Sequence, residues 1–149
     1  RANDMLATAE SCTGGWAAQV VTSAAGSSAW FERGFVTYSN AAKQELLGVR
    51  AETLRAHGAV SEETAREMAR GALERSQATI ALSITGVAGP AGGTPEKPVG
   101  TVCFAWARGG AVRSETRRFA GDRESIRRQS VILALEGVMR ALDGAPDGG

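Results

Sequence analysis

Residues 5–21, MLATAESCTGGWAAQVV, contain the pattern that decides the fold. The apolar segment 5–9 predicts a short buried strand, and the apolar positions within 16–21 predict a helix after it. Gly14 and Gly15 lie between the two and predict a tight turn. A strand, a turn and a helix in this order form the repeating unit of α/β proteins.

The same alternation continues along the chain and extends the α/β pattern to its last helix. Further strands are predicted at 30–38, 79–85, 101–107 and 111–119, with loops at 26–28 and 86–100 and a hairpin turn at Gly109 and Gly110. Helices are predicted to begin at the capping residues Asn40, Ser61 and Asp122, the first ending at Gly48 and the last near Leu142. We therefore expect a single layered α/β/α domain with a mixed sheet over residues 1–142, and a disordered tail at 143–149.

Composition narrows the classes of protein to which the chain can belong. A net charge of +1 gives no overall attraction to nucleic acid or membranes. No apolar run approaches the roughly 18 to 20 residues that span a bilayer, and the first ten residues are too weakly apolar for a signal peptide. Cys12 and Cys103 are too few for a disulfide framework, so we expect a cytoplasmic protein. Trp30 and Phe31 beside a loop are compatible with a homo-oligomer.

The turn at 9–15 is the first candidate site. Ser11 follows a strand and precedes a helix, and open α/β sheets bind ligands at that edge. The amides of Thr13, Gly14 and Gly15 would face an oxyanion or a phosphate there. The segment lacks the G-x-S-x-G pattern of the α/β-hydrolases. The alternative is a capping serine followed by an ordinary turn.

A serine nucleophile needs a base, and the chain offers few. His57, the single histidine, lies near a predicted helix end, where it favours a role beside the helix dipole. Only two of the 17 basic residues are lysines, and a desolvated lysine can lose its proton where arginine cannot. Lys43, assisted by Tyr38, is therefore the candidate base, with a solvated lysine as the alternative. Cys12 is a rival nucleophile, but neighbouring side chains point apart, so we expect it to pack in the core.

Two further segments are candidate anion sites. The glycine-rich loop at 83–101 includes Gly86 and Gly89, whose amides could surround an anion, with Lys97 adding charge. It lacks the Gly-Lys-Ser/Thr of a P-loop, and a flexible connection is the alternative. Arg123 and Arg127 stand at the start of the last helix, where positive charge is unfavourable unless an anion is bound. A solvated arginine face is the alternative there.

Several of these segments together match one known family. They are 8–15, 26–31, 34–40, Lys43, 47–49, 58–62, 85–90, 97–102 and 119–123. In number and order they resemble the C-terminal domain of the CinA (competence/damage-inducible protein A) family, and in particular its stand-alone amidohydrolases of nicotinamide mononucleotide. The resemblance covers roughly residues 6–142.

The resemblance implies conversion of nicotinamide mononucleotide and water to nicotinate mononucleotide and ammonia. It implies a catalytic group of Ser11, Tyr38 and Lys43, in which Lys43 accepts the serine proton directly or through Tyr38. It also implies substrate binding by Thr85 and by an arginine of the last helix, Arg123 or Arg127, with no metal and no cofactor. The role would be the recycling of pyridine nucleotides toward NAD. The alternative function is a non-catalytic nucleotide-sensing or protein-interaction module linked to competence or DNA damage.

Overall fold

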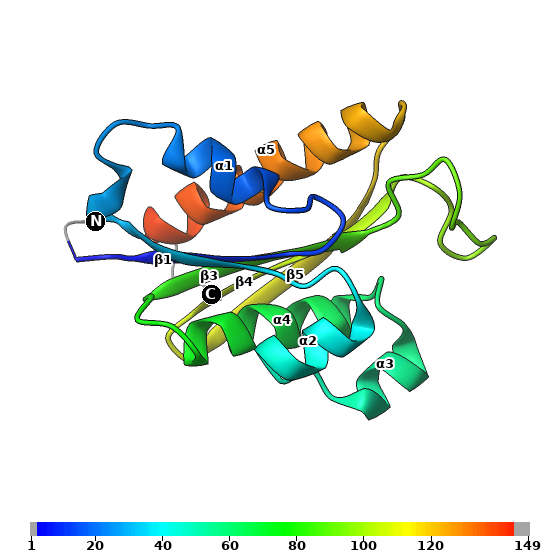
Figure 1. The fold of residues 1–149 in the computed structure, drawn as a ribbon, viewed down its shortest axis with the longest axis horizontal. Coiled ribbons are helices and arrows are strands. Elements are labelled where there is room, and N and C mark those ends of the chain that lie inside the picture. The colour runs from blue at the N-terminus through cyan, green and yellow to red at the C-terminus, as the bar shows by residue number, and fades with distance from the viewer. Residues whose placement is uncertain (1–2, 145–149) are drawn as a thin grey trace.

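The computed structural model describes residues 3–144 as a five-stranded mixed sheet between two layers of helices (Figure 1). The strands are β1 (Leu6–Glu10), β2 (Phe31–Val36), β3 (Ile80–Gly86), β4 (Thr101–Arg108) and β5 (Ala111–Arg118). The helices are α1 (Trp16–Thr22), η1 (Ser27–Ala29, a 3₁₀ turn), α2 (Asn40–Leu47), α3 (Ala51–His57), α4 (Glu62–Glu74) and α5 (Arg123–Leu142). Helices α1 and α5 cover one face of the sheet, and α2, α3 and α4 lie on the other. The predicted α/β/α layering with a mixed sheet is confirmed.

The strand order β2-β1-β3-β4-β5 determines where a ligand can bind. Strand β1 is parallel to both β2 and β3, so the carboxyl ends of these three strands meet at one edge. The chain leaves β1 through α1 on one face and leaves β2 through α2 to α4 on the other. This reversal at the end of β1 is a topological switch point, where open α/β sheets leave a crevice.

Burial explains the sequence pattern of the central strands. Strand β1 is covered on both faces, and all five of its residues are buried, which suits the small or apolar side chains of its first four residues. On α4, the buried residues Met68, Ala69 and Ala72 lie on one face of the helix and pack against the sheet. At Gly71 a Cβ atom would lie 1.9 Å from the Leu47 carbonyl oxygen, so glycine permits α2 and α4 to pack closely.

The structure corrects three local predictions. Asn40 is not the cap of α2, because the hydroxyl of the preceding residue, Ser39, accepts the Ala42 amide instead. The loop predicted at 26–28 contains part of η1. Helix α3 was predicted only through a helix end near His57, and its start was not predicted. The caps at Ser61 and Asp122 are confirmed by their hydrogen bonds from the amides of Thr64 and Ser125, and the predicted hairpin forms β4 and β5.

Two predictions concern the ends and the surroundings of the chain. Of the predicted tail at 143–149, residues 145–149 lie outside the described residues. Within residues 3–144, no helix is both long enough and apolar enough to cross a membrane.

Candidate active site

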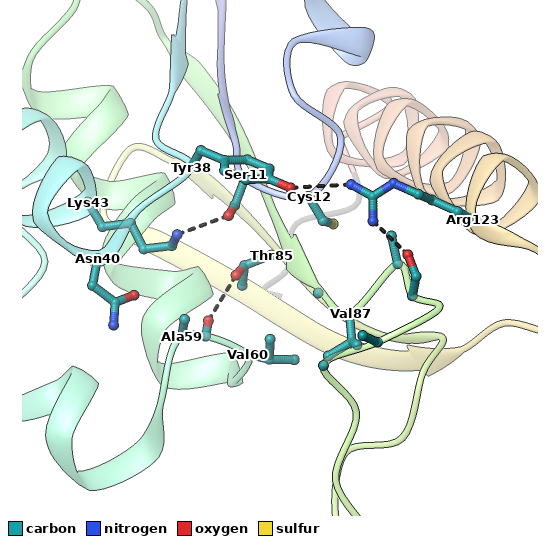
Figure 2. Close-up of a pocket in the computed structure, with 15 residues that line it drawn as sticks. Ser11, Cys12, Tyr38, Asn40, Lys43, Ala59, Val60, Thr85, Val87 and Arg123 are labelled. Atoms are coloured by element: carbon teal, nitrogen blue, oxygen red, sulfur yellow. Dashed lines mark hydrogen bonds between the residues drawn. The ribbon is translucent and has the colours of Figure 1, made fainter.

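A cavity of about 310 Å³ lies at the carboxyl edge of the parallel strands (Figure 2). Its lining comes from the turn after β1, the β2–α2 connection, the segment before α4, the glycine-rich loop and the start of α5. Of the predicted site residues, the cavity is lined by Ser11, Tyr38, Lys43, Thr85, Gly86, Gly89 and Arg123. Five segments that are distant in sequence therefore converge at the switch point of the sheet.

Ser11 and Lys43 form a direct pair inside this cavity. The Lys43 Nζ atom lies 2.9 Å from Ser11 Oγ and 2.9 Å from the Thr37 carbonyl oxygen. The Ser11 amide donates to the Ile84 carbonyl at 3.0 Å, which fixes the serine at the end of the sheet. Lys43 reaches the serine from the first turns of α2, as Figure 2 shows. In its neutral form, the lysine can accept the Ser11 proton while an N–H donates to Thr37.

Burial makes Lys43 a competent base. The side chain is only 1% exposed, and this desolvation lowers the pKa of the ammonium group from its ordinary value. A thiolate at Cys12 would oppose the shift. However, burial raises the pKa of the Cys12 thiol to about 12, so that thiol stays protonated near neutral pH. The fraction of neutral Lys43 is therefore larger than for a solvated lysine.

Cys12 lies closer to the cavity than the sequence predicted. We expected only one of two adjacent side chains to face the site, but both Ser11 and Cys12 line it. Cys12 also packs into the apolar core beneath α1 and α5, with Ala17 and Ile126 among its neighbours in that cluster. With a pKa of about 12 it contributes very little thiolate, and the thiolate is the nucleophilic form of cysteine.

Tyr38 and Arg123 form a second polar pair on the cavity wall. The Arg123 guanidinium donates to the Tyr38 hydroxyl at 3.3 Å and to the Gly89 carbonyl at 2.7 Å (Figure 2). Tyr38 is 63% exposed, and its described hydrogen bond runs to Arg123 rather than to Lys43 or Ser11. The geometry therefore favours direct proton transfer from Ser11 to Lys43 over a relay through Tyr38.

The end of β3 and the glycine-rich loop form a further part of the cavity wall. Thr85 is the last residue but one of β3, and its hydroxyl donates to the Ala59 carbonyl at 2.9 Å, which joins the end of β3 to the segment before α4. Gly89 has φ 81°, and a Cβ there would lie 2.5 Å from a methyl carbon of Val99. Glycine at this position is thus required both by the backbone conformation and by the space available.

The turn after Ser11 is fixed from within rather than open to a ligand. The buried Glu10 carboxylate accepts the Thr13 hydroxyl and the amides of residues 17 and 18 at the start of α1. The Gly14 amide donates to the Ser11 carbonyl at 3.0 Å, so it is already engaged. Thr13, Gly14 and Gly15 do not line the cavity. Sequence reasoning missed the role of Glu10, although its place directly before Ser11 was a usable signal.

Lys97 and Arg127 also lie outside the cavity. Lys97 Nζ donates to the His57 carbonyl at 2.8 Å and lines a separate surface depression. Arg127 donates through Nε to the Cys12 carbonyl and through a terminal nitrogen to the Thr13 carbonyl, both at 3.1 Å. Of the two candidate arginines of α5, only Arg123 therefore faces the cavity.

Several residues that line the cavity were not recognised from sequence, and two of them are Asn40 and Val60. Asn40, which we had expected to cap α2, lines the cavity, as does Val60, which precedes the cap of α4. Both belong to the stretches that carry the family resemblance, which was the available signal. Among residues 3–144, no cluster of three or more metal-binding side chains (His, Cys, Asp or Glu) is suited to hold a metal ion. That the reaction needs no metal stays a prediction.

Comparison of the sequence with known proteins shows the family of the chain. The family model described as "CinA C-terminal domain" matches residues 1–142. The nicotinamide-nucleotide amidohydrolase PncC of Escherichia coli K12 is 61% identical over 135 residues, covering 88% of this chain and 80% of that protein. PncC of Pseudomonas putida is 54% identical over 140 residues, covering 94% and 88%.

Solved structures agree with the sequence matches. The competence/damage-inducible protein CihA from Agrobacterium tumefaciens superposes with a TM-score of 0.91 at 50% identity, covering 92% of this chain and 84% of that one. The competence damage-inducible protein A (ComA) from Klebsiella pneumoniae gives 0.91 at 42% identity, covering 95% and 88%. The chain belongs to the CinA C-terminal domain family.

Proposed function

We propose that this chain is an amidohydrolase that converts nicotinamide mononucleotide and water to nicotinate mononucleotide and ammonia, with Ser11 as the nucleophile. The activity named for the PncC relatives supports the reaction. The single observation that carries the mechanism is the 2.9 Å contact between Lys43 Nζ and Ser11 Oγ within the cavity. A serine beside a buried lysine is an activated nucleophile of the kind that acyl transfer requires.

In the acylation step, neutral Lys43 accepts the proton of the Ser11 hydroxyl as Oγ attacks the carboxamide carbon of the substrate. The tetrahedral intermediate collapses when the C–N bond breaks. The leaving nitrogen takes the proton from the Lys43 ammonium and departs as ammonia. The nicotinoyl group is then esterified to Ser11.

In the deacylation step, Lys43 removes a proton from water, and the resulting hydroxide attacks the ester carbon. The Ser11–acyl bond breaks, and Oγ regains a proton from Lys43. Nicotinate mononucleotide leaves, and both residues return to their starting states. Metal and cofactor are not required at any step of this scheme.

Arg123 is proposed to bind the 5′-phosphate of the substrate. It is the arginine of α5 that lines the cavity, and its guanidinium lies on the wall formed with Tyr38 and Gly89. The phosphate is the strongly anionic group of the mononucleotide, and guanidinium binds phosphate in a bidentate manner. Binding energy from this remote group would hold the neutral carboxamide against Ser11.

We also propose that residues 1–142 act as one amidohydrolase domain in the cytoplasm, where the reaction returns nicotinamide nucleotides toward NAD synthesis. The small-molecule substrate is the expected partner.

Product analysis tests the proposed function. The purified chain is incubated with nicotinamide mononucleotide in the presence of excess chelator, and ammonia and nicotinate mononucleotide are quantified. Equal molar amounts of the two products are expected. A folded sample that binds the mononucleotide but releases no ammonia would favour the non-catalytic module instead.

A further inference from the structure

Arg127 makes contacts unlike those of any substrate-binding group described above. Its guanidinium donates to two consecutive backbone carbonyls, those of Cys12 and Thr13, at 3.1 Å each. The same group lies 5.3 Å from the centre of the Trp16 ring, within the range of a cation–π contact. Cys12 and Thr13 are the two residues that immediately follow Ser11. Arg127 thus connects α5 to the turn that carries the nucleophile.

The two hydrogen bonds constrain the turn on one side. The peptide unit is planar, so a hydrogen bond to its carbonyl oxygen restricts the orientation of the whole unit, and the units after Cys12 and Thr13 are both restrained relative to α5. On the other side, Glu10 holds the Thr13 hydroxyl and the start of α1. The turn after Ser11 is consequently held between a buried carboxylate and a guanidinium.

Gly14 suits this turn because of its backbone conformation rather than because of a lack of space. Gly14 has φ 59°, a conformation that residues with side chains rarely adopt, and a Cβ there would lie 3.5 Å from an Arg127 nitrogen. Arg127 therefore contacts the backbone of the turn through two consecutive residues, Cys12 and Thr13. Hydrogen bonds to the two peptide groups that follow the nucleophile restrict where Ser11 Oγ can point.

Arg123 and Arg127 stand one helical turn apart on α5 but contact different parts of the site. Arg123 is exposed and lines the cavity, whereas Arg127 is half-buried and lies outside it. The hydrogen bonds of Arg123 run to Gly89 and Tyr38, on the wall proposed to receive the phosphate. The two arginines thus serve different purposes despite their equivalent positions on one helical face.

We propose that Arg127 is a positioning residue that fixes Ser11 for attack and does not bind the substrate. This inference rests on the proposed function. A misplacement of about 1 Å at a reacting atom lowers the rate by on the order of 10²-fold. Lysine cannot replace the arginine, because a point-like ammonium lacks the planar fork that contacts two carbonyls at once.

The test compares three arginines of the same helix. Arg127→Lys and Arg127→Ala are measured beside Arg123→Ala and beside Arg128→Lys, a control at an exposed residue paired with Glu124. Turnover of nicotinamide mononucleotide gives kcat and KM. Calorimetry in a Ser11→Ala background gives the dissociation constant of the same mononucleotide without turnover.

Arg127→Lys is expected to lower kcat by about 10²-fold, while KM and the dissociation constant change by less than about threefold. Arg123→Ala is expected to weaken binding. Added guanidinium ion at millimolar concentration should partly restore kcat in Arg127→Ala, which a general loss of stability would not permit. The shape of the pH–rate profile should not change, because Lys43 remains in place.

The inference is overturned if Arg127→Lys weakens mononucleotide binding as much as Arg123→Ala does, or if it leaves kcat intact. Should Arg127→Ala fail to fold, Arg127→Lys still decides the matter, because it keeps the charge and part of the contact. If the wild-type chain binds the mononucleotide but releases no ammonia, the proposed function itself is wrong and this inference falls with it.

Discussion

Replacing Lys43 with methionine should lower turnover and should change the stability of the protein, relative to the wild type, by an amount that depends on pH. Lys43 is 1% exposed, and its burial lowers the pKa of the ammonium group. Between this lowered pKa and the ordinary value of 10.5, the unfolded chain binds more protons than the folded one. The stability of the wild type therefore rises with pH across that window, and below it the burial of Lys43 is destabilising.

The steepness with which the free energy of unfolding changes with pH depends on the number of protons that differ between the folded and unfolded chains. One proton gives a slope of at most about 1.4 kcal/mol per pH unit. Lys43→Met removes this dependence, so the stability of the variant relative to the wild type should decline as the pH is raised from 7 to 10. The variant also loses the contacts with Ser11 and the Thr37 carbonyl, at about 1 kcal/mol each, but this loss is nearly independent of pH.

Urea denaturation at several pH values between 7 and 10 measures the difference. Both proteins contain Cys12, whose own titration largely cancels in the comparison. Lys97→Met serves as the control for the loss of one lysine charge. Turnover by Lys43→Met should fall by at least about 10²-fold, the contribution of a general base. A stability difference that does not change with pH, or a variant that retains full turnover, would refute the reasoning about Lys43.

Four further predictions follow from the site and the core. Ser11→Ala should abolish ammonia release whereas Cys12→Ala should keep most of it, and the reverse result would make the cysteine the nucleophile. Arg123→Ala should lower kcat/KM for nicotinamide mononucleotide far more than for nicotinamide riboside, and an equal loss would remove the phosphate assignment. The pH–rate profile of the wild type should rise along a limb whose midpoint lies below 10.5, because burial lowers the Lys43 pKa, and a flat profile would contradict a lysine base. Gly137→Ala should destabilise the fold by about 1 to 3 kcal/mol in urea denaturation, because the new Cβ would lie 2.1 Å from the Trp106 ring, and unchanged stability would mean that the ring can move aside.

The sequence was informative where periodicity and turn chemistry act locally. The apolar run before Ser11, the capping residue Ser61 and the glycine pair at 109–110 each predicted an element that the structure contains. The start of helix α3 was missed because the helix has no apolar stripe, and only Thr53 is buried within it. A short helix held largely by its neighbours leaves little pattern in its own residues.

The sequence predicted which strand ends meet at the site. It did not predict which side chains are in contact there. Parallel strands place Ser11 and the β2–α2 connection at the same edge, so their convergence with Lys43 could be anticipated. Spacing could not separate Arg123 from Arg127, since residues four apart share a helical face. Lys97 follows the glycine-rich loop in sequence, yet its side chain turns to the His57 carbonyl. Such choices depend on contacts between distant segments.

The central claim is that Ser11, activated by Lys43, forms an acyl intermediate, and trapping that intermediate tests it most directly. The wild type and Ser11→Ala are incubated with nicotinamide mononucleotide and hydroxylamine, and the products are separated by mass. The account predicts that the wild type releases ammonia and forms both the hydroxamate and nicotinate mononucleotide, while Ser11→Ala forms neither. Release of ammonia by Ser11→Ala at the wild-type rate, with no hydroxamate from either protein, would contradict the account.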